Sequence, residues 1–192
     1  ILKDAGYKDV DGDGYVEDKE GKPLTITLLA AKGSETAEAV LQQYLTWWKE
    51  VGLNVQLLTG RTLDFQTYAE KLQKYADDFD MWTGGFTIGY NPSPDGLYGP
   101  KAAFNFGHFV EPKHTALLER ISSNETFDEN VKKQLFLEWQ QYVQENPFAI
   151  PRFNTFELTA VNKRVKKVNI TPDKGTGWEE VELVADKGVA AK

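Results

Sequence analysis

Residues 24–58 have the sequence LTITLLAAKGSETAEAVLQQYLTWWKEVGLNVQLL, and this stretch decides the fold. Residues 24–29 are rich in β-branched and apolar side chains, which is typical of a strand. A helix is predicted over residues 34–51, because Ser34 suits the N-cap and an apolar stripe at helical spacing follows it. Gly52 ends that helix, and residues 53–58 then alternate as a second strand does. This order predicts a βαβ unit with parallel strands and a right-handed crossover.

The rest of the chain continues the alternation of helices and strands. A second helix is predicted over residues 63–75, with Phe65, Tyr68 and Leu72 on one side, and a buried strand over residues 79–82. Further helices are expected at 113–122 and 128–145, strands at 155–161, 165–170 and 181–184, and a frayed tail at 185–192. The pattern is that of an α/β fold.

Composition excludes several classes of protein. The chain has 192 residues, of which 41% are hydrophobic and 12% aromatic, enough for a packed core. Its net charge of −7 and the lack of a basic run argue against a nucleic-acid partner. Cysteine is absent, which removes disulfides, zinc–thiolate sites and thiol nucleophiles. No apolar segment is long enough to span a membrane, and no signal peptide is present.

The first residues have the pattern of the last turn of a helix. Leu2 and Ala5 are followed by Gly6, a residue type that commonly ends helices. A chain that begins at a helix end is expected to be a fragment of a longer protein. Half of a binding site would then be missing from it.

Residues 9–20, the acidic loop, have the ligand spacing of a calcium loop of the EF-hand type. Asp9, Asp11, Asp13 and Glu20 occupy its first, third, fifth and twelfth positions, and Gly14 takes the sharp turn at the sixth. The expected calcium ligands are Asp9, Asp11, Asp13, the Tyr15 carbonyl, Glu17 and Glu20. A strand and not a helix follows the loop, so it would be a single calcium loop between a helix end and a strand. Lone loops of this kind in extracellular modules often bind weakly, on the order of 10⁻⁴–10⁻³ M, and the ion would be structural. The alternative is an acidic turn that binds nothing.

The sequence contains no G-x-S-x-G, G-x-x-x-x-G-K-S/T or G-x-G-x-x-G motif, so a protein without catalysis is expected. His108 and His114 are six residues apart and lack the spacing of a helical zinc pair. They are interpreted as surface or loop-anchoring residues. Acidic pairs such as Glu179 and Glu180 are too common in so acidic a chain to indicate a glycosidase.

Residues 84–112, the aromatic loop, have no periodicity but many glycine, proline and aromatic residues. A long loop of this kind is usually functional or held by a partner. Two interpretations are equally open for Phe104, Phe106 and Phe109. They either fasten the loop to the core or form a wall that faces a ligand.

The order of these features resembles a known family. It begins with an Ala-Gly-Tyr helix end at residues 5–7, the acidic loop and Gly-Lys-Pro-Leu-Thr-Ile at residues 21–26. It continues with Phe-Asp-Met at 79–81, Tyr-Asn-Pro-Ser-Pro at 90–94, Phe-Asn-Phe-Gly at 104–107 and Phe-Ala-Ile-Pro at 148–151. The chain resembles the C-terminal lobe of the peptide-binding proteins that serve ABC importers, solute-binding protein family 5, especially the surface lipoproteins of Gram-positive bacteria.

The resemblance implies one α/β lobe of a type II periplasmic binding protein, over residues 1–192, with a mixed sheet flanked by helices. The whole receptor would capture oligopeptides outside the cell and deliver them to a membrane permease. Its N-terminal lobe and lipid anchor would be absent from this chain. The implied ligand-binding residues are Trp82, Phe86, Thr87, Ile88, Gly89, Tyr90 and Asn91, with Phe104 and Asn105 as neighbours.

One position departs from the family pattern. Some members have an aspartate that pairs with the N-terminus of the peptide, and Gly89 occupies that place here. Loss of this charge would suit longer or more varied peptides. The main alternative function is an extracellular interaction module that calcium stabilises and that has no role in transport. A secreted hydrolase is the third possibility.

Overall fold

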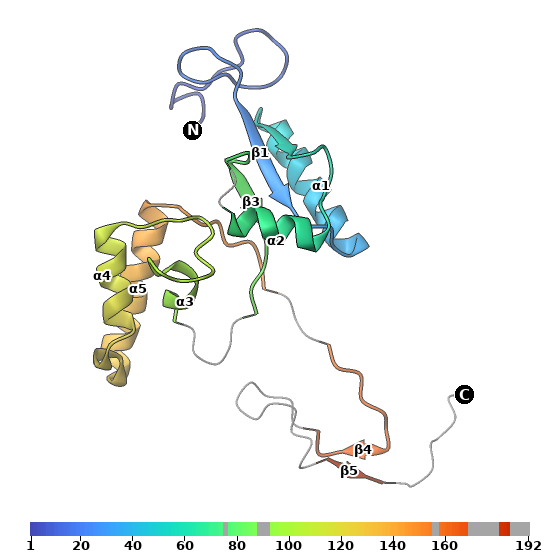
Figure 1. The fold of residues 1–192 in the computed structure, drawn as a ribbon, viewed down its shortest axis with the longest axis vertical. Coiled ribbons are helices and arrows are strands. Elements are labelled where there is room, and N and C mark those ends of the chain that lie inside the picture. The colour runs from blue at the N-terminus through green and yellow to red at the C-terminus, as the bar shows by residue number, and fades with distance from the viewer. Residues whose placement is uncertain (75–76, 88–92, 155–157, 169–180, 185–192) are drawn as a thin grey trace. The chain divides into compact units, whose positions relative to one another are not determined.

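The structure is a computed structural model that describes residues 1–74, 77–87, 93–154, 158–168 and 181–184 (Figure 1). It divides into an N-terminal unit, Ile1–Phe86, and a C-terminal unit, Thr87–Lys192. Within the described part of the chain, every helix is too short or too polar to cross a membrane.

The N-terminal unit contains a three-stranded parallel sheet with the strand order β2-β1-β3. Its strands are β1 (Thr25–Ala30), β2 (Asn54–Leu57) and β3 (Met81–Thr83). Ile26 lies opposite Val55, and Leu29 lies opposite Trp82. The predicted βαβ unit is therefore confirmed, with α1 (Glu35–Glu50) as its helix.

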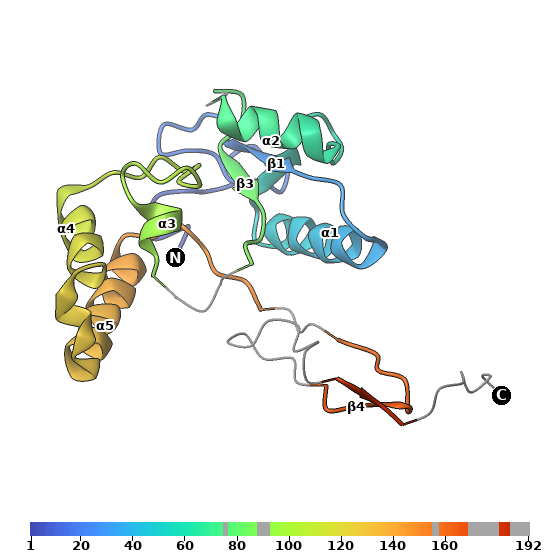
Figure 2. The ribbon, with the colours of Figure 1, turned by 60° about the horizontal axis from the view of Figure 1, so that its bottom comes forward.

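Each helix of this unit begins at a side-chain cap. Ser34 accepts a hydrogen bond from the Ala37 N–H, and Asp64 caps α2 (Phe65–Gln73) in the same way through the Thr67 N–H. The second helix begins later than predicted, because Leu63 forms a parallel bridge with Ala31 and extends the sheet. Figure 2 shows α1 and α2 on opposite faces of the sheet.

The main core of the unit lies between the sheet and α1. Buried Leu28, Ala30 and Leu41 form its centre, and partly buried hydrophobic residues pack around them: Leu45, Trp48, Val55, Leu57 and Met81. Successive side chains of a strand point to opposite faces of the sheet. Leu28 and Ala30 face α1, so Leu29, which is fully buried, faces the opposite side of the sheet. Burial of each such leucine stabilises the fold by about 2 kcal/mol.

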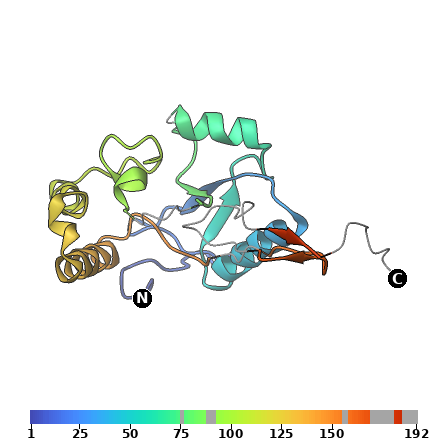
Figure 3. The same cartoon turned by 90° about the horizontal axis from the view of Figure 1, so that it is seen from below.

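The C-terminal unit is built on a pair of helices, α4 (Pro112–Ile121) and α5 (Glu129–Glu145). They lie side by side in Figure 1 and again in Figure 3, and both confirm the predicted helices. Leu118 and Leu135 are almost fully buried between them. The short helices α3 (Asp95–Tyr98) and η1 (Asn124–Phe127) were not predicted, because neither is long enough to show a helical period.

The predicted C-terminal strands are longer than those observed. The strands β4 (Val165–Lys166) and β5 (Glu182–Leu183) form a short antiparallel ladder. The next residue, Lys167, has a φ of 57°, a left-handed conformation that ends the strand. Residues 158–161 form no strand, which corrects that part of the prediction. Residues 155–157, 169–170 and the predicted frayed tail, 185–192, lie outside the described residues.

These elements confirm the α/β fold class. The described strands pair in parallel within β1–β3 and antiparallel within β4–β5.

Candidate functional site

The acidic loop follows a turn with the hydrogen bonds of a helix C-terminus. The Tyr7 N–H donates to the Leu2 carbonyl at 3.0 Å, and the Gly6 N–H donates to the Lys3 carbonyl at 3.2 Å. Gly6 has a φ of 95°, which a residue with a Cβ rarely adopts. This is the Schellman arrangement, as the helix-end pattern predicts.

Backbone N–H groups of the loop converge on Asp9. The Gly12 N–H donates to Asp9 Oδ1 at 2.7 Å, and the Gly14 N–H donates to Asp9 Oδ2 at 3.0 Å. Gly14 has a φ of 92°, so the sharp turn at the sixth position is confirmed. The loop therefore winds around its first carboxylate.

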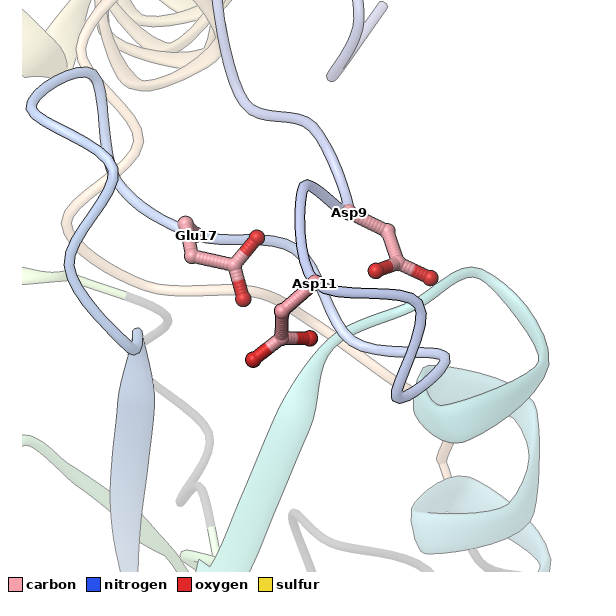
Figure 4. A group of neighbouring side chains, drawn as sticks. All are labelled: Asp9, Asp11 and Glu17. Carbon is pink, nitrogen blue, oxygen red and sulfur yellow. The ribbon is translucent and has the colours of Figure 1, made fainter.

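Three of the predicted calcium ligands lie together. Oxygen atoms of Asp9, Asp11 and Glu17 are within 4.8 Å of one another (Figure 4). Glu17 is only 4% exposed, and its Oε2 accepts the Val10 N–H at 2.7 Å. Three carboxylates so close repel one another unless a cation lies between them.

The other predicted ligands have different partners. Asp13 Oδ1 accepts the Tyr15 N–H at 2.8 Å, and Glu20 Oε2 lies 2.5 Å from Lys22 Nζ. Neither Asp13 nor Glu20 belongs to the three-carboxylate group. The Tyr15 N–H therefore forms a hydrogen bond within the loop. The prediction concerned the Tyr15 carbonyl, as a calcium ligand.

The loop is tied to the start of β1 and to the turn before β2. The Val16 N–H donates to the Gly52 carbonyl at 2.8 Å, and Glu17 forms isolated bridges with Lys8 and Pro23. Asp18 was not singled out from the sequence, yet its Oδ1 accepts the N–H groups of Lys22 and Glu20. The Lys22 hydrogen bond is the main cause that lowers the pKa of Asp18.

The predicted ligand-binding segment begins at the carboxyl end of β3. Tyr68 Oη donates to the Thr83 carbonyl at 3.0 Å, and the Trp82 ring meets the Phe86 ring edge-on at 6.2 Å. A Cβ on Gly84 would lie 2.9 Å from Tyr68 Oη and from the Trp82 ring, so a larger residue there would force one of these side chains to shift. Trp82 is half-buried and Phe86 is 37% exposed.

Thr83 is a residue that the sequence reasoning missed. Its Oγ1 is buried and has no hydrogen-bond partner, and no other side-chain polar atom of the described residues is in this state. Buried hydroxyls are normally paired, so this hydroxyl is available to accept or donate a hydrogen bond at the carboxyl end of β3. No pattern in the sequence marks this threonine.

The remaining predicted ligand residues belong to the C-terminal unit. Thr87 is exposed, whereas Ile88, Gly89, Tyr90 and Asn91 lie outside the described residues. Phe104 is 53% exposed and Asn105 only 7% exposed. The Asn105 side-chain amide donates to the carbonyls of Gly99 and Phe109, both at 3.2 Å, so it holds the aromatic loop in shape.

The composition of the aromatic loop left two interpretations open, attachment to the core or a wall that faces a ligand, and different parts of the loop fit each of them. Phe109 stacks on Phe148 at 4.3 Å, and Tyr98 meets the same ring at 5.2 Å, so this part is fastened to the helix pair. Phe104 instead contacts Phe106 edge-on at 6.1 Å and stays half-exposed. Phe104 therefore remains suited to a ligand wall.

His114 is not a surface residue, which corrects that part of its interpretation. It is 1% exposed on α4, and its Nε2 accepts the Trp139 Nε1–H at 3.1 Å. Burial lowers the pKa of His114, and the Glu111 charge acts in the opposite direction. Glu111 also accepts the Tyr142 hydroxyl at 2.8 Å, and burial followed by this contact raises the pKa of Tyr142 to about 12. The histidine is a neutral core residue.

A family comparison decides the class of the protein. Residues 1–107 match the family model of bacterial extracellular solute-binding proteins, family 5, middle region. The chain belongs to this family. Its members are binding receptors and not enzymes, which confirms the expectation of a protein without catalysis.

Sequence relatives cover nearly all of this family 5 chain. It is 31% identical over 191 residues to "Oligopeptide-binding protein OppA" of Lactococcus lactis subsp. lactis (strain IL1403), over 97% of this chain and 31% of the relative. It is 23% identical over 148 residues to "Oligopeptide-binding protein AppA" of Bacillus subtilis (strain 168), over 76% of this chain and 26% of the relative. The chain thus spans about a third of the length of this OppA and about a quarter of that of AppA.

Solved structures confirm the fold class as that of the type II periplasmic binding proteins. Lactococcal OppA, complexed with an endogenous peptide in the closed conformation, matches with a TM-score of 0.71 and 29% identity, over 77% of this chain and 28% of that one. Bacillus subtilis AppA in complex with a nonapeptide matches with a TM-score of 0.69 and 18% identity, over 96% and 36%. At that identity AppA shows the fold alone.

Proposed function

We propose that this chain is the C-terminal lobe of an extracellular receptor that captures oligopeptides and delivers them to the permease of an ABC importer. The observation that carries the proposal is the 31% identity to OppA along 97% of the chain. A matching fold supports it, because the lactococcal OppA structure contains a peptide. In this proposal the rest of the receptor supplies an N-terminal lobe and a lipid anchor.

The proposed ligand-binding residues are those from Trp82 to Asn91, together with Phe104 on the aromatic loop. Ligands of open α/β sheets bind beyond the carboxyl ends of the strands, which is where Thr83 and Phe86 lie. The unpaired Thr83 hydroxyl and the Trp82–Phe86 ring pair supply one polar and two aromatic groups there. Asn105 acts indirectly, by holding the loop that carries Phe104.

Peptide binding tests the proposal directly. Titration calorimetry of the complete gene product that carries these residues should show binding of a nonapeptide and of shorter peptides. The 192-residue chain alone should bind weakly or not at all, because one lobe offers half a cleft. Absence of binding by the complete product to every peptide tried would overturn the proposal. Micromolar binding by these residues alone would contradict the half-cleft argument.

The same titrations examine the peptide N-terminus. Gly89 cannot form an ion pair, so N-acetylation of the peptide should change the affinity little. A large loss of affinity on acetylation would contradict this. It would show that another group of the receptor holds the terminal ammonium.

We also propose that the acidic loop binds calcium as a structural ion. The spacing of the ligands supports this, as does the grouping of Asp9, Asp11 and Glu17. The bonds of the loop to Gly52 and Pro23 suggest what the ion does: it would fasten the start of β1 to the turn before β2. Calcium-dependent stability without any peptide binding would favour the alternative function, an extracellular interaction module.

A further inference from the structure

A cavity of about 370 Å³ opens in the N-terminal unit beyond the carboxyl ends of β1 and β2. Five residues line it: Lys32, Arg61, Thr62, Leu63 and Asp64. Its volume is in the range of small-ligand sites. Lys32 follows β1, and the other four lie between β2 and α2. We refer to it as the cationic cavity.

Backbone contacts join the two segments that carry the cationic residues of this cavity. The Lys32 N–H donates to the Leu63 carbonyl at 2.6 Å, and the Leu63 N–H donates to the Ala30 carbonyl at 3.0 Å. Arg61 follows directly after Gly60, whose φ of 72° makes the turn that leaves β2. Both cations therefore project from segments that are fixed to the sheet, although 28 residues (61 − 32 − 1) separate them in the sequence.

The two cations form no ion pair within the described structure. Neither the Lys32 ammonium nor the Arg61 guanidinium forms an ion pair or a hydrogen bond with any described residue, although Asp64 lines the same cavity. The carboxylates at the cavity have other partners. Asp64 accepts the Thr67 N–H at 3.0 Å and the Thr67 hydroxyl at 2.6 Å, and Glu38 accepts the Gly33 N–H at 2.9 Å. Two cations and one carboxylate thus line the cavity, and Glu38 lies beside it, but neither cation is paired with these carboxylates in the described structure.

We infer that the cationic cavity binds a carboxylate of the captured peptide, either an acidic side chain or the C-terminal carboxylate. The inference rests on the proposed function, because it places the cavity at the ligand-binding edge of the sheet. A guanidinium matches a carboxylate through two parallel N–H···O bonds, and an ammonium adds a second point of attraction. The Thr62 hydroxyl is a third polar group at the cavity, and it now donates to Glu38 at 3.3 Å.

Competition between matched peptides tests this inference on the complete gene product. The probes are a neutral nonapeptide with an amidated C-terminus, the same peptide with a free C-terminus, and amidated versions with one Glu or one Gln at each position in turn. A carboxylate in register with the cavity should strengthen binding about tenfold over its neutral counterpart. The advantage should shrink as salt is raised, because exposed charges are screened within about 10 Å at 0.1 M salt.

The double variant K32Q/R61Q should lose that advantage and still bind the neutral amidated peptide with unchanged affinity. The matched control is K3Q/K133Q, which removes two exposed lysines that have no ion pair with any described residue. It should keep the preference. A charge-reversed variant, K32E/R61E, should favour a peptide with Lys at the same position. Thermal melts check that each variant is folded.

The possible outcomes separate the two claims. If the wild type binds neutral peptides but shows no preference for a carboxylate, or K32Q/R61Q keeps the preference, the cavity inference is overturned and the proposed function stands. If no peptide of any charge binds, the proposed function itself fails. A preference for the free C-terminus alone identifies the peptide terminus as the source of the carboxylate, and a preference for one Glu position identifies a side chain.

Discussion

Replacement of Asp11 by Asn should have opposite effects on stability with and without calcium. The oxygens of Asp9, Asp11 and Glu17 lie within 4.8 Å of one another. Two unit charges at that separation repel by about 0.9 kcal/mol in water, and about 0.5 kcal/mol remains at 0.1 M salt. Asp11 takes part in two of the three repulsive pairs, so D11N should stabilise the calcium-free protein by about 1 kcal/mol. Asn keeps the acceptor for the Asp13 N–H, which lies at 3.1 Å.

Calcium reverses the sign of this effect. An ion held at about 10⁻⁴–10⁻³ M stabilises the folded wild type by about 1.5–3 kcal/mol when calcium is about 10 mM. Loss of one of three clustered carboxylates should remove most of that gain. In calcium, D11N should therefore be less stable than the wild type by about 0.5–1.5 kcal/mol, the calcium gain less the repulsion that is relieved.

Urea unfolding followed by circular dichroism, in a chelator and in calcium, measures both effects. The matched control is E119Q, which removes one exposed carboxylate from α4 and should respond to calcium as the wild type does. A wild-type stability that calcium leaves unchanged would refute the calcium site. A D11N effect of the same sign in both conditions would refute the reasoning from repulsion.

Three further outcomes are expected. Burial lowers the pKa of His114 below its ordinary value of 6.5, so the unfolded chain binds a proton more readily than the folded one. Stability should be full above that value and fall as the pH drops from 7.5 to 5.5, as urea midpoints would show; a flat profile would contradict this. G84A should destabilise the protein by about 1–3 kcal/mol in thermal melts, because its Cβ meets Tyr68 and Trp82. G85A is the control, since a Cβ at Gly85 meets nothing within 4 Å, and equal effects would count against the steric argument. N105A should cost about 1–3 kcal/mol and speed amide hydrogen exchange in residues 99–109, because two loop carbonyls lose their donor; unchanged exchange would show that Asn105 does not hold the loop.

Local patterns predicted most of the N-terminal unit. The apolar stripe of α1, its Ser34 cap and the terminating Gly52 are determined within one segment, and the structure confirms them. The parallel pairing of β1 with β2 then follows from the short connection through that helix. Short elements were harder to predict. The four-residue helices α3 and η1 are too short for a period to show, and the strands β4 and β5 were predicted in the right places but too long.

The candidate sites also depend partly on local sequence spacing and partly on tertiary packing. The spacing of Asp9, Asp11 and Glu17 is visible in the sequence, because one tight loop carries all three. The sequence by itself also determined the order of motifs that indicates the family, and the comparison with family 5 confirms it.

Only the tertiary structure decided which side chains meet across the chain. It turned Glu20 toward Lys22, buried His114 against Trp139, and left the Thr83 hydroxyl without a hydrogen-bond partner among the described residues. It also brought Lys32 and Arg61 to the same cavity, through a bridge between Ala31 and Leu63. Helical periods, caps and loop spacings depend on neighbours along the chain. Contacts between distant residues depend on how the sheet and helices pack, which no local pattern specifies.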